Sequence, residues 1–358
     1  MGGDIIFAVA LLAGLLFLLL IGLEIAWSVG VIALIGLVFF VDQPVNQIAY
    51  TMWDSLNSFT LTALPLFVLM GSILGNTGVN EKLFSAINKW VGQLSGGLVI
   101  SVICGNAVFA AMSGSAMAAT ATFGKIAFPA MKKRGYSPRF ALGSIASGSV
   151  LAPLIPPSIL LIIYGAWQGL SIVDLLAAGL IPGLMLMVLL LLTAFTMVKI
   201  WPSLAPTPFK ATWAERGKAL IEILPFVVVI VGVLGAIFGG FMTATEAGGL
   251  GAVLSIILTL CYRRLTYAIL MQSLLDTVKV TSFSLFIMAM ATLISHVFNS
   301  AGIIPMIKDV VLGLEVGRYT ILIGFFVMYL VMGMFFDSWS MLFLTFPFVM
   351  PIIVGLGF

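Results

Sequence analysis

The sequence predicts an all-α polytopic membrane protein, and its composition and two features of its apolar stretches support this fold class. The chain of 358 residues is 62% hydrophobic and 8% charged, whereas soluble domains carry about 25% charged residues. Apolar stretches such as Ile5–Leu23, Leu175–Ile200 and Tyr319–Phe336 approach or exceed the roughly 20 residues that a helix needs to cross a bilayer. Other apolar stretches are shorter and are interrupted by proline, glycine or serine, which predicts helices that break inside the membrane.

Few residues of this chain favour metal or redox chemistry. Cys104 and Cys261 both lie in apolar stretches, and His296 is the one histidine. Two isolated cysteines predict no disulfide framework, and the set is too small for a zinc or iron–sulfur centre. We therefore expect no cofactor and no transition metal. The first apolar stretch lacks a basic leader and an evident cleavage site, so we expect it to be retained as a helix.

Short apolar spans occur in pairs around a polar break. The pairs are 96–111 with 116–131, 139–152 with 158–168, and 319–336 with 338–356. Paired segments too short to span a membrane alone are typical of re-entrant hairpins and discontinuous helices, which form binding sites in transporters. We expect two re-entrant helical hairpins, from the first and third pairs, and a broken helix over 139–168.

The chain also shows a weak internal repeat. Its halves align at a nearly constant offset, which is better support than any single match between common residues. At an offset of 222 residues the matched pairs are Ser115 with Asp337, Pro129 with Pro351, and Gly135 with Gly357.

This repeat divides the chain into a first half, 1–200, an amphipathic linker arm, 201–221, and a second half, 222–358. The first hairpin is followed by basic residues, whereas its counterpart ends in "PIIVGLGF", which has none. The positive-inside rule then places the two ends on opposite sides of the membrane, which predicts an inverted repeat. The second half stops before a counterpart of the broken helix, so we expect either further helices beyond Phe358 or a partial repeat. The basic residues are Lys132, Lys133, Arg134 and Arg139.

The tripeptide Ser113-Gly114-Ser115 separates the two arms of the first hairpin. A turn here would expose hydroxyls and backbone carbonyls, the oxygen ligands that alkali cations prefer. Glycine permits a tight turn. The alternative is helix packing through small residues, which is common in membranes.

The stretch "SGSVLAPLIPPSILLIIYG" contains three prolines, Pro153, Pro156 and Pro157, between Ser149 and Ser158. Proline removes a backbone donor and clashes with the preceding turn of a helix. The freed carbonyls need another partner, so the stretch is a candidate ion or substrate cradle. The alternative is a proline kink without a ligand.

Three further polar positions have a candidate role. Asp337 lies between apolar runs, next to Ser338 and Ser340, and an intramembrane carboxylate marks a functional site by default; its alternative is a helix cap. The pattern Thr243-x-x-Glu246 before an apolar run predicts a structural capping box. We interpret His296 as a packing or interfacial residue.

Several motifs resemble those of a known family. The segments "MSGSAMAATATFGKIAFPAMKKRGYSP", "LIPPSILLIIYG", "TATEA" and "GMFFD" are similar to the large membrane (permease) subunit of tripartite ATP-independent periplasmic (TRAP) transporters. The resemblance implies sodium-coupled uptake of small organic anions, such as C4-dicarboxylates, sialic acid or keto acids, by an elevator motion. It also implies a small membrane subunit on a separate chain, a periplasmic substrate-binding protein, and a place in the bacterial or archaeal cytoplasmic (inner) membrane.

The same resemblance assigns roles to individual residues. One sodium ion would bind Ser113, Gly114 and Ser115 together with Ser149, Leu151 and Pro153, and a second would bind Asp337 and Ser338. The organic anion would contact Ser115, Pro156, Pro157 and Ser158 between the two hairpin tips. Sodium is the one metal ion implied, and no nucleic acid is expected.

Two alternatives remain at this point. An intramembrane serine hydrolase would use Ser115 as its nucleophile and His296 as its base. An ion channel would conduct passively, without saturation or coupling to a gradient.

Overall fold

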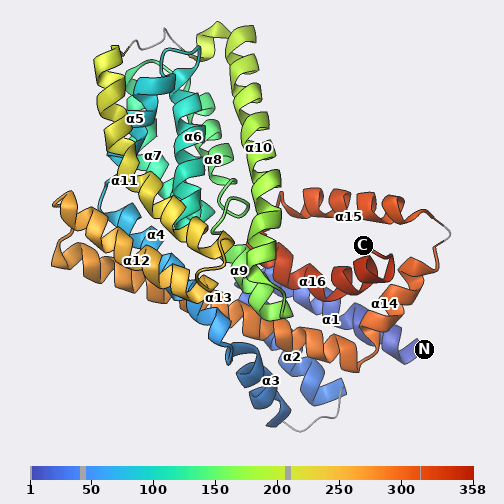
Figure 1. The fold of residues 1–358 in the computed structure, drawn as a ribbon. Coiled ribbons are helices and arrows are strands. Elements are labelled where there is room, and N and C mark those ends of the chain that lie inside the picture. Colours follow the sequence, from blue (N-terminus) through green and yellow to red (C-terminus); the bar gives the residue numbers. More distant parts are fainter. Residues whose placement is uncertain (1, 41–45, 206–210, 315) are drawn as a thin grey trace. The chain divides into compact units, whose positions relative to one another are not determined.

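The computed structural model describes residues 2–40, 46–205, 211–314 and 316–358, and this part of the chain contains helices but no strand (Figure 1). The first helices are α1 (Gly2–Leu20), α2 (Ile25–Phe40), α3 (Asn46–Leu56), η1 (Phe59–Thr62), α4 (Ala63–Asn76), α5 (Asn80–Val91), α6 (Gly97–Ser113), α7 (Ala116–Lys133) and α8 (Pro138–Ser149). They are followed by α9 (Ile159–Gln168), α10 (Ile172–Ile200), η2 (Pro202–Leu204), α11 (Trp213–Phe238), α12 (Ala244–Cys261), α13 (Tyr267–Ser300), α14 (Ile303–Leu312), α15 (Arg318–Met332) and α16 (Ser338–Gly355).

Six helical segments among the described residues are long and apolar enough to cross a membrane, which confirms the polytopic helical class. They are Phe59–Asn76, Ile172–Ile200, Trp213–Phe238, Ala244–Cys261, Tyr267–Ser300 and Ser338–Gly355. Shorter apolar helices, among them α6 and α9, accompany them. Long spans and short segments therefore coexist, as the interrupted hydrophobic pattern predicts.

The chain forms two compact units, which are described separately. Unit 1 combines the chain up to Asn57 with Ser282–Phe358, and unit 2 is Ser58–Thr281. These units cut across the two halves expected from the repeat, because each unit takes helices from both halves. The two compact units therefore differ from the two halves that the internal repeat predicts.

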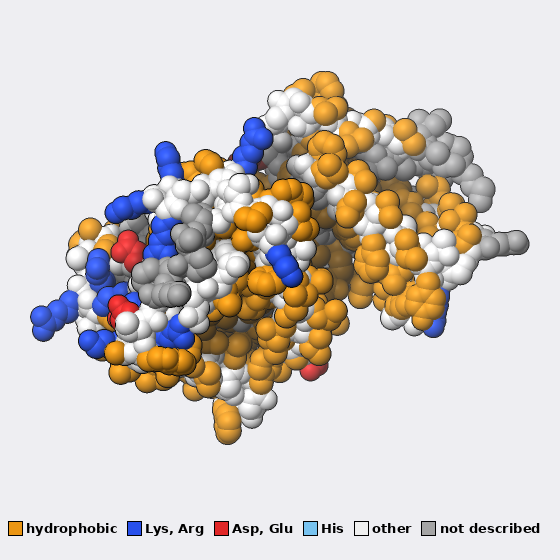
Figure 2. Space-filling view, turned by 90° about the horizontal axis from the view of Figure 1, so that it is seen from above, with side chains coloured by type: hydrophobic (Ala, Val, Ile, Leu, Met, Phe, Trp, Pro, Cys, Tyr) orange, Lys and Arg blue, Asp and Glu red, His pale blue; other side chains and the backbone are white. Residues whose placement is uncertain are grey.

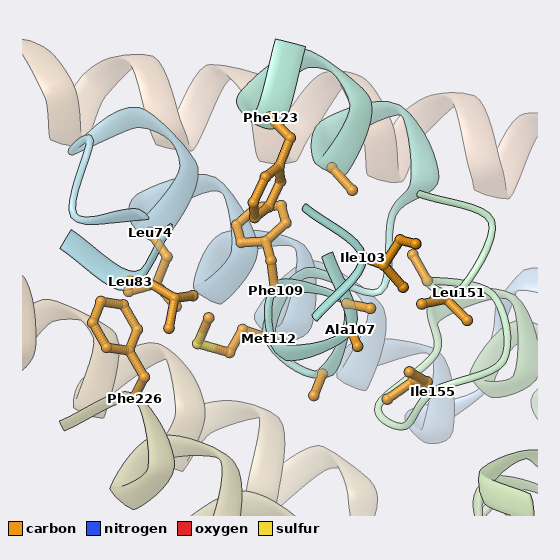
Figure 3. Packing of buried hydrophobic residues seen from close by; sticks show 14 of the residues in the cluster. Leu74, Leu83, Ile103, Ala107, Phe109, Met112, Phe123, Leu151, Ile155 and Phe226 are labelled. Carbon is orange, nitrogen blue, oxygen red and sulfur yellow. The ribbon is translucent and has the colours of Figure 1, made fainter. Parts of the chain in front are cut away.

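Unit 2 is built around α6. Almost every side chain of α6 is buried, and the helix packs against α4, α5, α7, α8 and α10. Figure 3 shows Phe109 and Met112 of α6 between Phe123 of α7 and side chains of neighbouring helices. Since protein surrounds α6, the first arm of the predicted hairpin is enclosed by protein and does not face lipid.

Unit 1 has its own core, formed by α1, α2, α14 and the later part of α13. Two glycines of α2 set its distance from α13. A Cβ atom at Gly30 would lie 2.5 Å from the sulfur of Met290, and one at Gly36 would lie 2.6 Å from a methyl group of Val297. Small residues at such crossings allow close helix packing, as is common in membranes.

Local structure recurs along the chain at the offsets that suggested the repeat. Ser115 is the N-cap of α7, and Asp337 is the N-cap of α16. Gly135 and Gly357, which follow these two helices, have φ angles of 77° and 76°. Polar N-caps and left-handed glycines are common at helix ends, so the repeat and the opposite orientation of its second half stay predictions.

The expected linker arm, 201–221, is not a separate segment throughout. Its part at 206–210 lies outside the described residues. From Trp213 onward it is continuous with α11. The cause is a capping box, in which the Glu215 carboxylate accepts a hydrogen bond from Thr212 N at 2.7 Å and the Thr212 hydroxyl accepts one from Glu215 N.

Tyr136, in the turn after α7, stabilises the start of α6. Its buried hydroxyl accepts a hydrogen bond from Leu98 N at 3.3 Å, one of the backbone donors that a helix leaves unpaired in its first turn. Burial raises the pKa of Tyr136, so the group stays neutral. We predict that Tyr136→Phe lowers stability by about 1 kcal/mol, measured as melting temperature in detergent. Tyr267→Phe, at an exposed site, should have almost no effect, and equal effects would contradict this role.

Candidate functional site

The first hairpin turns at the predicted tripeptide. Helix α6 ends at Ser113, and Gly114 takes the left-handed conformation with a φ of 57°. Ser115 is extended, and its hydroxyl caps α7 by accepting a hydrogen bond from Ala118 N at 3.3 Å. The interruption of the helix at 113–115 is therefore confirmed.

The broken helix is also confirmed, and it is more than a kink. Helix α8 ends at Ser149, residues 150–158 form irregular turns, and α9 begins at Ile159. Ser158 closes the interruption, because its hydroxyl donates to Pro153 O at 2.6 Å and accepts from Leu161 N at 3.3 Å. The unwound segment is thus held by specific side-chain bonds.

The two interruptions meet. A Cβ atom at Gly114 would lie 2.7 Å from Pro157 O and 2.9 Å from Ile159 N, so the hairpin tip lies against the end of the unwound segment. A hydrogen bond of 2.7 Å from the Thr120 hydroxyl joins α7 to the hydroxyl of Ser149, at the end of α8. Ser113, Gly114, Ser115, Ser149 and the segment 150–158 therefore belong to one region of unit 2.

This region contains buried oxygen atoms without a hydrogen-bond partner among the described residues. The Ser113 hydroxyl is one, on a residue only 3% exposed. The Oδ1 atom of Asn106 is another, although its Nδ2 atom donates to Val102 O at 3.0 Å. Buried polar atoms in native structures nearly always have a partner. An unpaired hydroxyl beside a hairpin tip therefore suggests a place for water or an ion.

The end of α6 supplies further oxygen atoms. Gly114 N donates to Ala110 O at 2.9 Å, and the next carbonyls, of Ala111, Met112 and Ser113, accept no hydrogen bond within the described part of the chain. The carboxyl end of a helix carries partial negative charge and attracts cations. The donor set of oxygens without a fixed opposite charge fits an alkali cation.

Other predicted ligands already have protein partners. The Leu151 carbonyl accepts hydrogen bonds from Leu154 N and Ile155 N, and the Pro153 carbonyl accepts one from Ser158. Ser149 donates to Ala146 O at 2.7 Å. The Pro153 carbonyl and the Ser149 hydroxyl each keep a free lone pair, whereas both lone pairs of the Leu151 carbonyl are used. The assignment of all three as ion ligands stays a prediction, with Ser113 as the better-placed hydroxyl.

The second hairpin has a similar interruption, in unit 1. Helix α15 ends at Met332 and α16 begins at Ser338. The Asp337 carboxylate caps α16 by accepting hydrogen bonds from Trp339 N at 3.1 Å and from the Ser340 hydroxyl. Asp337 and Ser338 are exposed. The geometry is that of a helix cap, which was one of the two interpretations, and sodium binding at Asp337 stays a prediction.

Thr243 and Glu246 form the predicted capping box at the start of α12. The Glu246 carboxylate accepts from Thr243 N at 2.8 Å, and Thr243 in turn accepts from Glu246 N at 3.3 Å. The equivalent box at Thr212 and Glu215 was missed, although the pattern "TWAE" carries the same signal.

Three residues near the tip have no distinguishing signal in the sequence. Gly71 of α4 faces Ser113, because a Cβ atom there would lie 2.7 Å from Ser113 Cα. Asn106 lies against Gly148 of α8 in the same way. Thr120, which bonds Ser149, was not singled out. Small and polar residues are frequent in this chain, so no local signal distinguished these three.

The helical spans define the class of this molecule, a multi-pass helical membrane protein. Residues 12–358 match the family model described as "Tripartite ATP-independent periplasmic transporter, DctM component". The chain therefore belongs to the TRAP transporter large permease family. Its members lie in the inner membrane and are transporter permeases, not enzymes, so the hydrolase alternative has no support.

Named relatives agree with this assignment. The C4-dicarboxylate TRAP transporter large permease protein DctM of Vibrio cholerae is 32% identical over 98% of this chain and 82% of its own length. The 2,3-diketo-L-gulonate TRAP transporter large permease protein YiaN of Escherichia coli is 32% identical over 94% of this chain and 79% of its own. The sialic acid TRAP transporter large permease protein SiaM of Vibrio cholerae is 30% identical over 96% of this chain and 80% of its own length.

Proposed function

We propose that this chain is the permease subunit of a sodium-coupled secondary transporter that takes up a small organic anion. A small membrane subunit and a periplasmic substrate-binding protein would complete the system, and the transport step would be an elevator motion of the hairpins. The relatives named above are labelled by C4-dicarboxylate, 2,3-diketo-L-gulonate and sialic acid, which are all carboxylates at neutral pH. Carboxylate recognition is their shared chemistry.

The observation that carries the sodium proposal is the unpaired Ser113 hydroxyl at the end of α6. It lies with free helix-end carbonyls beside an unwound segment. In transporters, half-helix ends and unwound backbone bind coupling ions near the middle of the membrane. The tip of the first hairpin therefore has the oxygen atoms and the partial negative charge that a sodium ion requires.

The transport proposal is tested by uptake into proteoliposomes that contain this chain, its small subunit and its binding protein. Candidate anions are the three named for the relatives. We expect saturable uptake that exceeds the external concentration and requires an inward sodium gradient. Uptake that does not saturate or never exceeds the external concentration would indicate a channel. Saturable, concentrative uptake that persists without sodium would reject the sodium coupling and leave the transport proposal intact.

Ser113→Ala is predicted to raise the sodium concentration for half-maximal uptake by about tenfold, the loss expected for one oxygen contact to a charged group. Ser28→Ala provides the matched control, because Ser28 is equally buried and its hydroxyl bonds the carbonyl of Glu24 in its own chain segment. An unchanged sodium dependence in Ser113→Ala, with normal folding, would remove Ser113 from the ion site.

A further inference from the structure

An open cavity lies on unit 2, away from the hairpin tip. It has a volume of about 530 Å³ and is bounded by α6, α8, α10 and η2. In Figure 1, α10 runs beside α6 and α8 along this side of the unit. Volumes of about 300–1,000 Å³ are typical of small-molecule sites. We call this cavity the α8–α10 groove.

One end of the α8–α10 groove is polar and basic. Arg139 and Ser137 line it. The Arg139 guanidinium and the Ser137 hydroxyl make no hydrogen bond or ion pair among the described residues. A guanidinium binds phosphate oxygens in pairs, and a hydroxyl can donate to a third. This end of the groove therefore offers unused donors to an anion.

The surroundings reinforce that positive charge. Lys132 and Lys133 end α7, Lys199 lies in the last turn of α10, and all three are exposed. Ser137 N donates to Leu204 O at 3.2 Å, so the start of α8 and the segment after α10 lie together. On the face seen from above the view of Figure 1, Figure 2 shows several lysine and arginine side chains with a few acidic side chains among them. By the positive-inside rule this end is cytoplasmic, the side on which anionic lipids attract basic residues.

The rest of the groove is apolar. Leu190, Ala194 and Met197 of α10 form one wall, and Val99 and Ile103 of α6 form another. Other side chains of α10 are strongly exposed, among them Met185 at 61% and Leu189 at 57%. Such an apolar surface, on a helix long enough to cross a membrane, is suited to contact with lipid, and an acyl chain lying on it would reach the groove.

We propose that the α8–α10 groove binds one anionic phospholipid. The phosphate contacts Arg139 and Ser137, and an acyl chain lies along α10. Basic pockets between membrane helices on the cytoplasmic side bind lipid head groups of this kind. An uncharged transmembrane helix of a partner would leave the Arg139 charge unpaired, whereas one phospholipid supplies both a phosphate and acyl chains, which favours a lipid. The inference depends on the membrane location and not on the transported substrate.

The glycine at position 143 supplies a way to block the groove. Gly143 lines it, and a Cβ atom there would meet nothing within 4 Å. Gly143→Leu therefore fills the apolar part without a clash at its Cβ. Gly124→Leu on α7 is the matched control, because its Cβ is equally unobstructed and it does not line the groove. Lys132→Gln is the matched control for Arg139→Gln, since it removes one charge at the same end.

The experiment is native mass spectrometry of the intact protein, purified in detergent and titrated with phosphatidylglycerol or phosphatidylethanolamine. We expect one phosphatidylglycerol to bind more tightly than the others. Arg139→Gln should weaken it about fivefold, the effect of one basic residue near a lipid surface, while Lys132→Gln leaves it nearly unchanged. Gly143→Leu should abolish tight binding of the single lipid, and Gly124→Leu should not.

Several results would overturn the proposal. Equal losses in Arg139→Gln and Lys132→Gln would show general attraction to the basic surface. Unchanged binding in Gly143→Leu would place the lipid elsewhere. Displacement of the lipid by glycerol phosphate would show that the head group alone is recognised, and displacement by the small membrane subunit would identify the groove as a protein interface. Unaltered melting temperatures of the variants before lipid addition verify that each is folded.

Discussion

Replacing Gly114 with alanine is expected to abolish sodium-dependent uptake. The residue has a φ of 57°, which costs an L-residue about 1–2 kcal/mol. Its new Cβ atom would also lie 2.7 Å from Pro157 O, so the hairpin tip and the unwound segment must separate. The oxygens that we propose as sodium ligands on the two sides would then be misplaced. Uptake into proteoliposomes is the measurement, accompanied by melting temperature in detergent.

Gly124→Ala is the control for this change. Gly124 lies within α7 of the same hairpin, and a Cβ atom there would meet nothing. Alanine in a helix interior is favoured over glycine by about 1 kcal/mol, so this variant should transport normally and melt at the same or a higher temperature. Normal uptake by Gly114→Ala would mean that close contact between the tip and the unwound segment is not needed for transport.

Replacing Ser158 with alanine is expected to loosen the broken helix, at a cost of about 2–3 kcal/mol. The variant loses the cap of α9 and leaves Pro153 O without its partner. Ser158 itself is fully buried. We expect a lower melting temperature and strongly reduced uptake.

Ser171→Ala is the control, because Ser171 caps a helix but makes no bond to the unwound segment. Ser171 caps α10 by accepting from Asp174 N at 3.3 Å, and the bond is exposed. Its replacement should cost about 1 kcal/mol and should leave uptake intact. If the two serine variants were equally stable and equally active, Ser158 would be an ordinary helix cap.

The positions of the apolar helices could be predicted from the sequence, because a long hydrophobic run has one stable arrangement in a membrane. Helices α3 and α5 were not predicted, because polar residues interrupt their apolar ones: Asp54 in α3, and Glu81 and Lys89 in α5. The first part of α13, which begins at Tyr267, is not evident from the sequence, because Gln272 and Asp276 interrupt its apolar character. Amphipathic helical segments are therefore not identified by long apolar runs.

The helix breaks at the candidate site were predictable for a similar reason. Glycine, serine and proline act locally on the backbone, so their effect at 113–115 and 153–157 needs no knowledge of the fold. The packing of Gly71 on Ser113 and the bond from Thr120 to Ser149 depend on helices brought together by folding. Such contacts between distant segments leave no mark in a single sequence.

The hairpin contacts the broken helix at two separate points. Thr120 bonds Ser149, and Gly114 lies against Pro157. Two attachments prevent one element from rotating about the other. We therefore expect these elements to travel as a single block, so that a bound ion would keep its ligands while its surroundings change.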